Sequence, residues 1–155
     1  MTKAFEDNFS EFQADMVAIC LEYASNRVDE IYIYCSSEEK VISSNFFFRI
    51  NGMLVRKHKL NDVANFGTDV FTYNTSGYRQ RVALKIINEN IEKIIELCKE
   101  FDRKMPTEMK LIYNVKRNSL VADYKYDLVY TNDPEKTADD VENEWFIDNM
   151  GESAI

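Results

Sequence analysis

The dipeptide Asn51-Gly52 constrains the fold of this chain more than any other pair of residues. It lies between two short apolar runs, residues 46–50 and residues 53–56. Asparagine and glycine adopt positive φ angles readily, as a two-residue type I′ turn between antiparallel strands requires. The sequence therefore predicts a β-hairpin. Its facing pairs are Ile50 with Met53, Phe48 with Val55, and Phe47 with Arg56.

Side chains that alternate in type with a period of two predict three more strands. In residues 31–35 the isoleucines point to one side and the tyrosines to the other. Residues 109–115 and 120–128 alternate in the same way around a polar turn at residues 116–119. These two runs indicate a second hairpin, in which Leu111 faces Tyr124.

Apolar residues spaced by three and four predict two long helices, residues 4–26 and 76–104. Pro106 prevents the second helix from continuing, because proline lacks the backbone N–H that a helix interior uses. A third helix is expected to begin with Asp133 as its cap and Pro134 at its first position. Residues 61–74 have no period and contain Gly67, so they are expected to form a loop.

The resulting order, α-β-β-β-α-β-β-α, lacks the strand-helix-strand repeats of a parallel sheet. It predicts an α+β fold with a five-stranded, mainly antiparallel sheet packed with helices. A chain of 155 residues is long enough for one core. Residues 1–150 are therefore expected to form a single domain, and residues 151–155 a disordered tail. The expected core includes Ile91, Ile94, Cys98, Leu111 and Tyr124.

The net charge of the chain arises at one end. Residues 123–155 carry ten acidic and two basic side chains, whereas the seventeen acids and seventeen bases of residues 1–122 balance. The net charge of −8 therefore belongs to this end alone. A field concentrated on one surface attracts a basic partner and repels nucleic acid.

We therefore expect the acidic end to bind a basic protein. The residues expected to contact this partner are Asp123, Asp127, Asp133, Asp139, Asp140, Glu142, Glu144 and Asp148. The alternative is a solvated surface that only keeps the protein soluble. Trp145, the sole tryptophan, either packs this end onto the sheet, which we favour, or anchors an interface.

No combination of residues predicts catalytic chemistry, a cofactor or a metal site. His58 is the single histidine, and the cysteines lack the spacing of zinc ligands. Cys20, Cys35 and Cys98 lie in apolar segments, so they are expected to be buried thiols in a reducing compartment. Two alternatives are disfavoured: an enzyme that uses the clustered acids, and a nucleic-acid site at the basic residues 56–59.

No segment approaches the roughly 20 apolar residues that cross a bilayer, so no membrane contact is expected. The first residues include no uninterrupted apolar run before the acids begin. These features predict a cytoplasmic protein. They leave its oligomeric state open.

Four stretches of the chain share a pattern with a known family. They are residues 28–34 (VDEIYIY) after the opening helix, residues 45–48 (NFFF), residues 105–113 (MPTEMKLIY) after the long helix, and residues 124–127 (YKYD) before the acidic, tryptophan-containing end. This layout resembles the YezG-like family of bacterial immunity proteins. The resemblance implies a small cytoplasmic antitoxin without catalysis of its own, which binds and occludes a secreted toxin, a nuclease with a basic active site.

Secretion chaperones of the type III class have the same order of elements. They are small and acidic, and they bind an extended effector segment as dimers. Their first helices and strands are rich in Leu and Gly, whereas this chain has no glycine before Gly52. An acidic chaperone or adaptor that binds an effector protein is therefore the alternative function.

Overall fold

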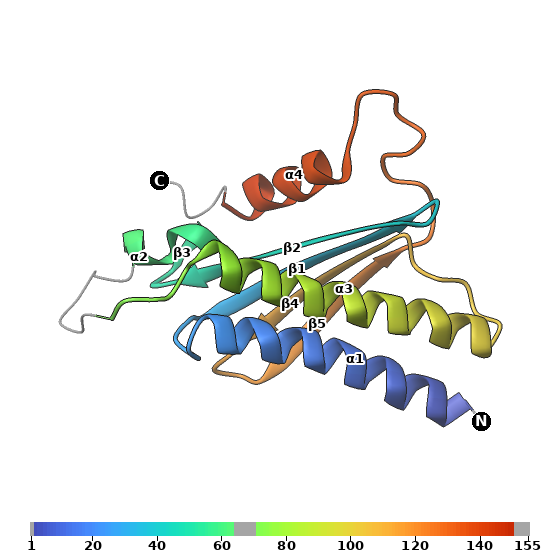
Figure 1. Ribbon diagram of the computed structural model, residues 1–155, viewed down its shortest axis with the longest axis horizontal. Helices are drawn as coiled ribbons and strands as arrows, with labels where there is room; N and C mark the ends of the chain where they lie inside the picture. The colour runs from blue at the N-terminus through green and yellow to red at the C-terminus, as the bar shows by residue number, and fades with distance from the viewer. Residues whose placement is uncertain (1, 64–70, 151–155) are drawn as a thin grey trace.

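The computed structural model describes residues 2–63 and 71–150 (Figure 1). Its strands are β1 (Glu30–Glu38), β2 (Val41–Ile50), β3 (Met53–Arg56), β4 (Glu108–Asn114) and β5 (Ser119–Lys125). Its helices are α1 (Thr2–Tyr23), α2 (Leu60–Val63), α3 (Gly77–Glu100) and α4 (Ala138–Met150), with a 3₁₀ turn, η1 (Lys57–Lys59), before α2. The predicted tail and residues 64–70 of the predicted loop lie outside the described residues.

The strands form one sheet in the order β3-β2-β1-β4-β5. Every neighbouring pair is antiparallel. The predicted α+β fold with a five-stranded antiparallel sheet is therefore confirmed. The described part of the chain contains one α-helix more than expected, the single turn α2.

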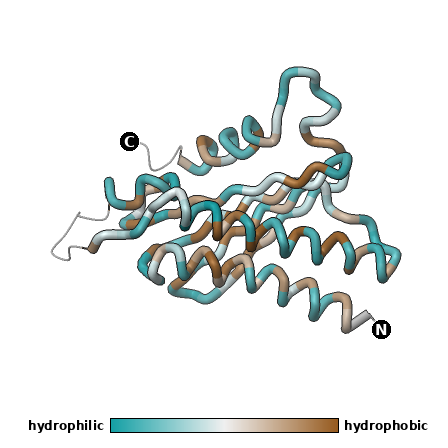
Figure 2. Tube along the Cα trace, viewed as in Figure 1, coloured by the Kyte–Doolittle hydropathy of each residue, from teal (hydrophilic) through white to brown (hydrophobic). Residues whose placement is uncertain are grey.

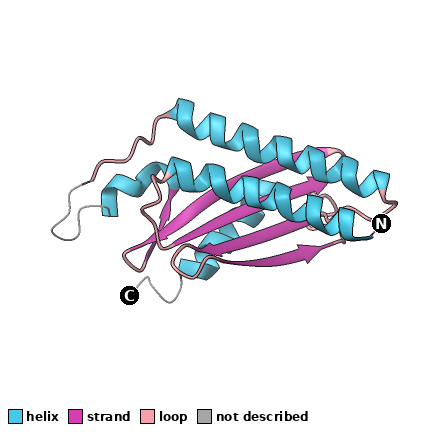
Figure 3. Ribbon diagram, turned by 90° about the horizontal axis from the view of Figure 1, so that it is seen from below, coloured by secondary structure: helices cyan, strands magenta, loops and turns pink. Residues whose placement is uncertain are grey.

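Helices cover both faces of the sheet. α1 and α3 lie side by side on one face, which we call the first face, and α4 lies on the opposite, second face (Figures 1 and 3). In the central strand β1, Ile31 and Ile33 belong to the core of the first face, and Tyr32 and Tyr34 to that of the second. The alternating strand therefore contributes to two separate cores, and Figure 2 shows the hydrophobic residues concentrated in the strands and the two long helices.

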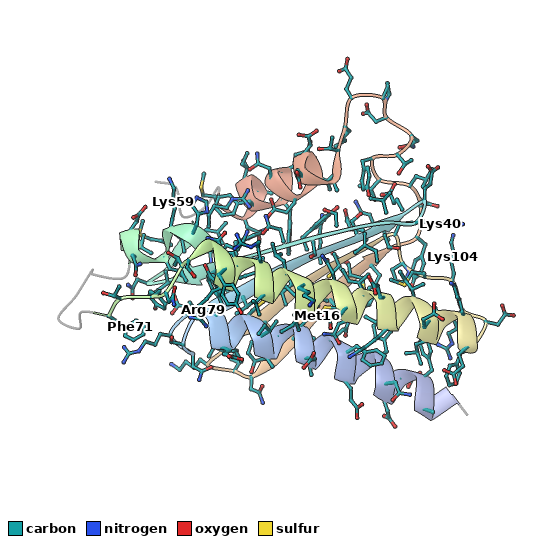
Figure 4. All side chains as sticks on the ribbon, viewed as in Figure 1. Met16, Lys40, Lys59, Phe71, Arg79 and Lys104 are labelled. Atoms are coloured by element: carbon teal, nitrogen blue, oxygen red, sulfur yellow. The ribbon has the colours of Figure 1, made fainter. Side chains whose placement is uncertain are left out.

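The first face carries the larger core. Met16 of α1, labelled in Figure 4, is fully buried in it. The core also contains the predicted members Ile91, Ile94, Cys98 and Leu111, each at most 2% exposed. Tyr124 differs from the prediction: it is 37% exposed at the rim of this face. The reason is that its strand, β5, lies at the edge of the sheet.

The hairpin at Asn51-Gly52 has the predicted register. Its facing pairs are Ile50 with Met53, Phe48 with Val55, and Phe47 with Arg56. Asn51 and Gly52 have φ angles of 52° and 77°. A Cβ atom on Gly52 would meet nothing within 4 Å, so the backbone conformation selects glycine at this position.

The predicted register of the second hairpin is wrong. Leu111 faces Ala122, and Tyr124 faces Met109. The turn consists of residues 115–118, one residue earlier than expected, and moving a turn by one residue shifts the register by two. Oδ1 of Asn114 accepts a hydrogen bond from the N–H of Arg117 at 2.9 Å and stabilises the turn in this position.

Both long helices end earlier than predicted, because a residue with positive φ follows each end. These residues are Ser25 (φ 54°) after α1 and Asp102 (φ 52°) after α3. After α3, the N–H of Arg103 donates to the carbonyl oxygen of Cys98 at 2.8 Å, which completes a Schellman motif. Pro106 therefore does not end the helix.

α4 begins later than predicted, at Ala138. Thr137 and Asp140 form a reciprocal capping box: Oγ1 of Thr137 accepts from the N–H of Asp140 at 3.2 Å, and Oδ2 of Asp140 accepts from the N–H of Thr137 at 3.0 Å. Asp133, the predicted cap, instead accepts from the N–H of Glu135 in a local turn. The helix begins at the capping box because the box satisfies two backbone donors, the N–H groups of Thr137 and Asp140.

Trp145 packs α4 onto the second face, as we favoured from the sequence. Its side chain is 8% exposed. The centroid of its ring lies 5.2 Å from that of Phe47, 5.8 Å from that of Tyr32 and 6.2 Å from that of Tyr34. An aromatic cluster beneath α4 therefore forms the second core.

Trp145→Ala is expected to lower the free energy of unfolding by about 3–5 kcal/mol, because it removes the largest side chain of this core. Ile147→Ala is the matched control, since Ile147 lies on the same helix and is 51% exposed. It should change stability by less than about 0.5 kcal/mol. Urea unfolding followed by circular dichroism measures both. Equal effects of the two substitutions would contradict the described docking of α4.

Candidate functional site

Two arginines of the sheet hold α4, the helix that carries most of the predicted contact residues. Arg56 of β3 donates from Nη1 to both carboxylate oxygens of Glu142, at 2.8 and 2.6 Å. Its Nη2 donates to Oδ1 of Asn143 at 2.7 Å. The guanidinium carbon also lies 4.0 Å from the centroid of the Phe146 ring. Arg56 therefore combines a charge-assisted pair with a cation–π contact on the inner side of α4.

Arg49 of β2 binds the other end of the helix. Its Nη2 donates to the carbonyl oxygen of Asn149 at 3.1 Å, where a cation complements the partial negative charge of the last turn. Its Nε donates to Oε1 of Glu30 at 3.1 Å and to the hydroxyl of Tyr32 at 3.2 Å. These contacts fix the guanidinium, so α4 is held near both its ends.

Glu142 is a correction to the predicted contact surface. It lies on the inner side of α4, is 4% exposed, and is engaged by Arg56. A partner protein has no access to its carboxylate. Removing one member of a buried ion pair costs about 3–5 kcal/mol, so Glu142 serves the fold.

The other seven predicted contact residues are exposed. On α4, Asp140, Glu144 and Asp148 recur at every fourth position and form one line along its outer side. Asp139 neighbours this line. The remaining three lie elsewhere: Asp127 and Asp133 in the segment between β5 and α4, and Asp123 on β5. The acidic surface therefore follows the outer side of α4 and extends over the connecting segment, which Figure 1 shows rising on the same side of the sheet.

Little positive charge neutralises this acidic surface. Nζ of Lys136 lies 3.2 Å from Oε2 of Glu144. Within residues 2–63 and 71–150, no other ion pair involves the seven exposed acids. The surface therefore keeps most of its negative potential.

Glu38, at the end of β1, anchors the segment that leads to α4. Its buried carboxylate accepts hydrogen bonds from the N–H of Val129 at 3.0 Å, and from the N–H and hydroxyl of Thr131 at 3.2 and 2.6 Å. Burial raises the pKa of Glu38, but these hydrogen bonds and one from the N–H of Tyr130 lower the pKa by more. The net pKa therefore lies below its usual value, and the carboxylate stays charged at neutral pH.

Glu108 is a second buried acid on the same face. It is 2% exposed and accepts a hydrogen bond from the hydroxyl of Tyr34 at 2.9 Å. Nζ of Lys110 lies 3.5 Å from Oε1 of Glu108, and Nζ of Lys125 lies 3.8 Å from the same oxygen. Burial, and then the charge of Glu108, raise the pKa of Tyr34, so its hydroxyl remains a donor. Sequence reasoning missed Glu38 and Glu108, because each stands at the end of a strand and belongs to no motif.

The three cysteines are buried, as predicted. Burial raises the pKa of the Cys20 and Cys98 thiols, and raises the pKa of Cys35 to about 12. His58, the single histidine, is exposed on η1. In the part of the chain that the structure describes, no group of three His, Cys, Asp or Glu side chains is placed to hold a metal ion.

Comparisons with known proteins add no family assignment. No protein-family model matches the sequence, and no curated protein matches it. The resemblance to the YezG-like family stays a prediction. Among the described residues, no helix combines the length and apolar character needed to span a membrane.

Because the pKa of Glu38 is lowered in the folded protein, the free energy of unfolding depends on pH. The ionised carboxylate stabilises the fold above its unfolded pKa of about 4.3, and this contribution is lost as the pH falls through the lower folded pKa. Glu38→Gln should therefore lose about 1–3 kcal/mol of unfolding free energy at pH 7, and less at pH 3. Urea unfolding at several pH values measures the difference. Glu39→Gln, at an exposed neighbouring position, should match the wild type throughout.

The raised thiol pKa values predict slow alkylation. At neutral pH, a polar alkylating reagent should modify Cys20, Cys35 and Cys98 at least about a hundredfold more slowly in the native protein than in urea, because burial removes both access and the reactive thiolate. Mass spectrometry of timed reactions gives the rate for each cysteine. Fast modification of any one thiol would support a nucleophilic role for that residue.

Proposed function

We propose that this protein is an immunity-type inhibitor, which binds a basic toxin domain and occludes its active site without catalysis of its own. The observation that supports it is the line of exposed acids on the outer side of α4: Asp140, Glu144 and Asp148. The inner side of the same helix is held by Arg49 and Arg56.

Stability accounts for Asp140, which caps α4, but not for Glu144 and Asp148. Like charges four residues apart in a helix destabilise it by about 0.2–0.5 kcal/mol per pair. Asp148 stands in the last part of α4, where the helix dipole favours a cation, and the last turn has no basic residue. A helix that retains these unfavourable charges while buried contacts fix its position is well suited to present them to a partner.

A basic nuclease site is the partner that this surface complements. Nucleases bind phosphate with Lys and Arg, and carboxylates spaced along a fixed helix can take the place of phosphates. Because α4 is already docked, little ordering entropy opposes the association. The resemblance to the YezG-like family supports the same function, and a cytoplasmic location belongs to the proposal, since an immunity protein protects the cell that makes the toxin.

The test uses a variant without three of the exposed charges, Asp139→Asn, Glu144→Gln and Asp148→Asn. Glu142 is left unchanged because it is buried, and Asp140 because it caps the helix. The control removes three exposed acids of α3 on the opposite side of the sheet, Glu89→Gln, Glu92→Gln and Glu100→Gln. Both variants should unfold like the wild type within about 1 kcal/mol.

The partner is sought among the neighbouring genes, and association with a toxin domain encoded there is measured by stopped flow at low and high salt. At low salt the α4 variant should bind at least about tenfold more slowly, and the α3 variant at the wild-type rate, because charge steering acts through the contact surface. At high salt the rates should converge. If the two variants associate at equal rates at low salt, the acids of α4 serve only to keep the protein soluble. If a neighbouring gene instead encodes a non-toxic protein whose secretion requires this protein, the chaperone function is favoured.

A further inference from the structure

β5 has an outer edge that no strand of the described sheet covers. Its seven residues pair with β4 in unbroken register, so the strand has no bulge, and it contains no proline. The opposite edge strand, β3, has four residues and leads directly into η1. Proteins usually block long, flat edges because they pair with other strands. β5 is therefore the sheet edge best suited to an intermolecular contact.

The outward backbone groups of β5 belong to Leu120, Ala122 and Tyr124. The N–H of Ser37 in β1 donates to the carbonyl oxygen of Thr107 at 2.9 Å, so the odd-numbered residues of β4 bond to β1. The even-numbered residues of β4 therefore bond to β5, where their partners are the odd-numbered residues 119–125. The three even-numbered residues of β5 direct their N–H and C=O groups away from the sheet.

α1 and β5 enclose two grooves beside this edge, on the first face. One groove, of about 320 Å³, is lined mainly by Phe5, Phe9, Pro106, Tyr124 and Tyr126, with Lys104 (labelled in Figure 4) at its border. The other, of about 360 Å³, is lined by Ala14, Val17, Ala18, Leu21, Tyr113 and Leu120. A hydrogen bond of 2.7 Å from Nε2 of Gln13 to the hydroxyl of Tyr124 marks the border between them. Each groove thus has one exposed apolar side chain of β5 in its wall.

We infer that β5 binds β5 of a second copy of this chain, antiparallel, and joins two sheets into one. One register pairs every outward residue with an outward residue: Ala122 faces Ala122 of the second copy, and Leu120 faces its Tyr124. In antiparallel strands each such pair exchanges two backbone hydrogen bonds. The symmetry is closed, so association stops at the dimer.

The side chains of the two copies complement each other in this register. On the first face, Leu120 of one copy lies beside Tyr124 of the other, and each groove gains an apolar side chain. On the second face, Val121 faces Asp123 and Ser119 faces Lys125. No like charges are directly opposite, so this register avoids the cross-strand pairs that destabilise a sheet. The inference does not rest on the proposed function, because the acids of α4 lie over the opposite part of the sheet and only Asp123 of the seven exposed acids lies on β5.

Substitutions at Val121, which is 66% exposed, test the register with little effect on the monomer. Val121→Glu places a carboxylate opposite Asp123 of the other copy, twice in each dimer, and should raise the dissociation constant at least about tenfold. Val121→Lys places an opposite charge there and should keep or lower the constant. Val41→Glu, at a 59% exposed position of β2, is the matched control and should leave it unchanged. Sedimentation equilibrium over a concentration series measures all four proteins.

Hydrogen exchange provides a second measurement on the wild type. The amides of Leu120, Ala122 and Tyr124 should exchange more slowly as the protein concentration rises, while the exchange of exposed loop amides stays constant. A wild type that is monomeric at every concentration would overturn the inference, as would equal constants for Val121→Glu and Val121→Lys. Protection of these amides only when a toxin domain is added would also overturn it, and would assign the edge to that partner.

Discussion

β1 is paired on both edges and buried on both faces, and this double burial governs the arrangement of the other elements. Its isoleucines require α1 and α3 on the first face, and its tyrosines require α4 on the second. Burying a large apolar side chain contributes about 1.5–3 kcal/mol, so exposing either face would remove several such contributions. Neither layer of helices is dispensable.

The position of the acidic surface is determined by residues far from it in the sequence. Trp145 supplies apolar burial, whereas Arg49, Arg56 and Glu38 determine where α4 and its connecting segment lie. A helix of 13 residues with a line of like charges has little stability by itself. The surface therefore exists only in the folded protein, and its geometry depends on the hairpin of β2 and β3, which carries Arg49 and Arg56.

Local signals in the sequence predicted the elements that local chemistry determines. Asn51-Gly52 specified a register because both residues suit one turn type, whereas the second hairpin has no glycine in its turn and its predicted register was wrong. Asp133-Pro134 looked like a helix start, but the capping box at Thr137 is used. Glu142 was misplaced because its partner Arg56 lies 86 residues away, a distance at which sequence pattern carries no information about pairing.

The separation of the two cores has an optical and chemical consequence. The sole tryptophan lies in the core beneath α4, and all three cysteines lie in the core beneath α1 and α3. The intrinsic fluorescence of the protein therefore reports on one layer, and thiol labelling on the other. Without any engineered label, the two signals show whether the layers melt together or whether α4 detaches first.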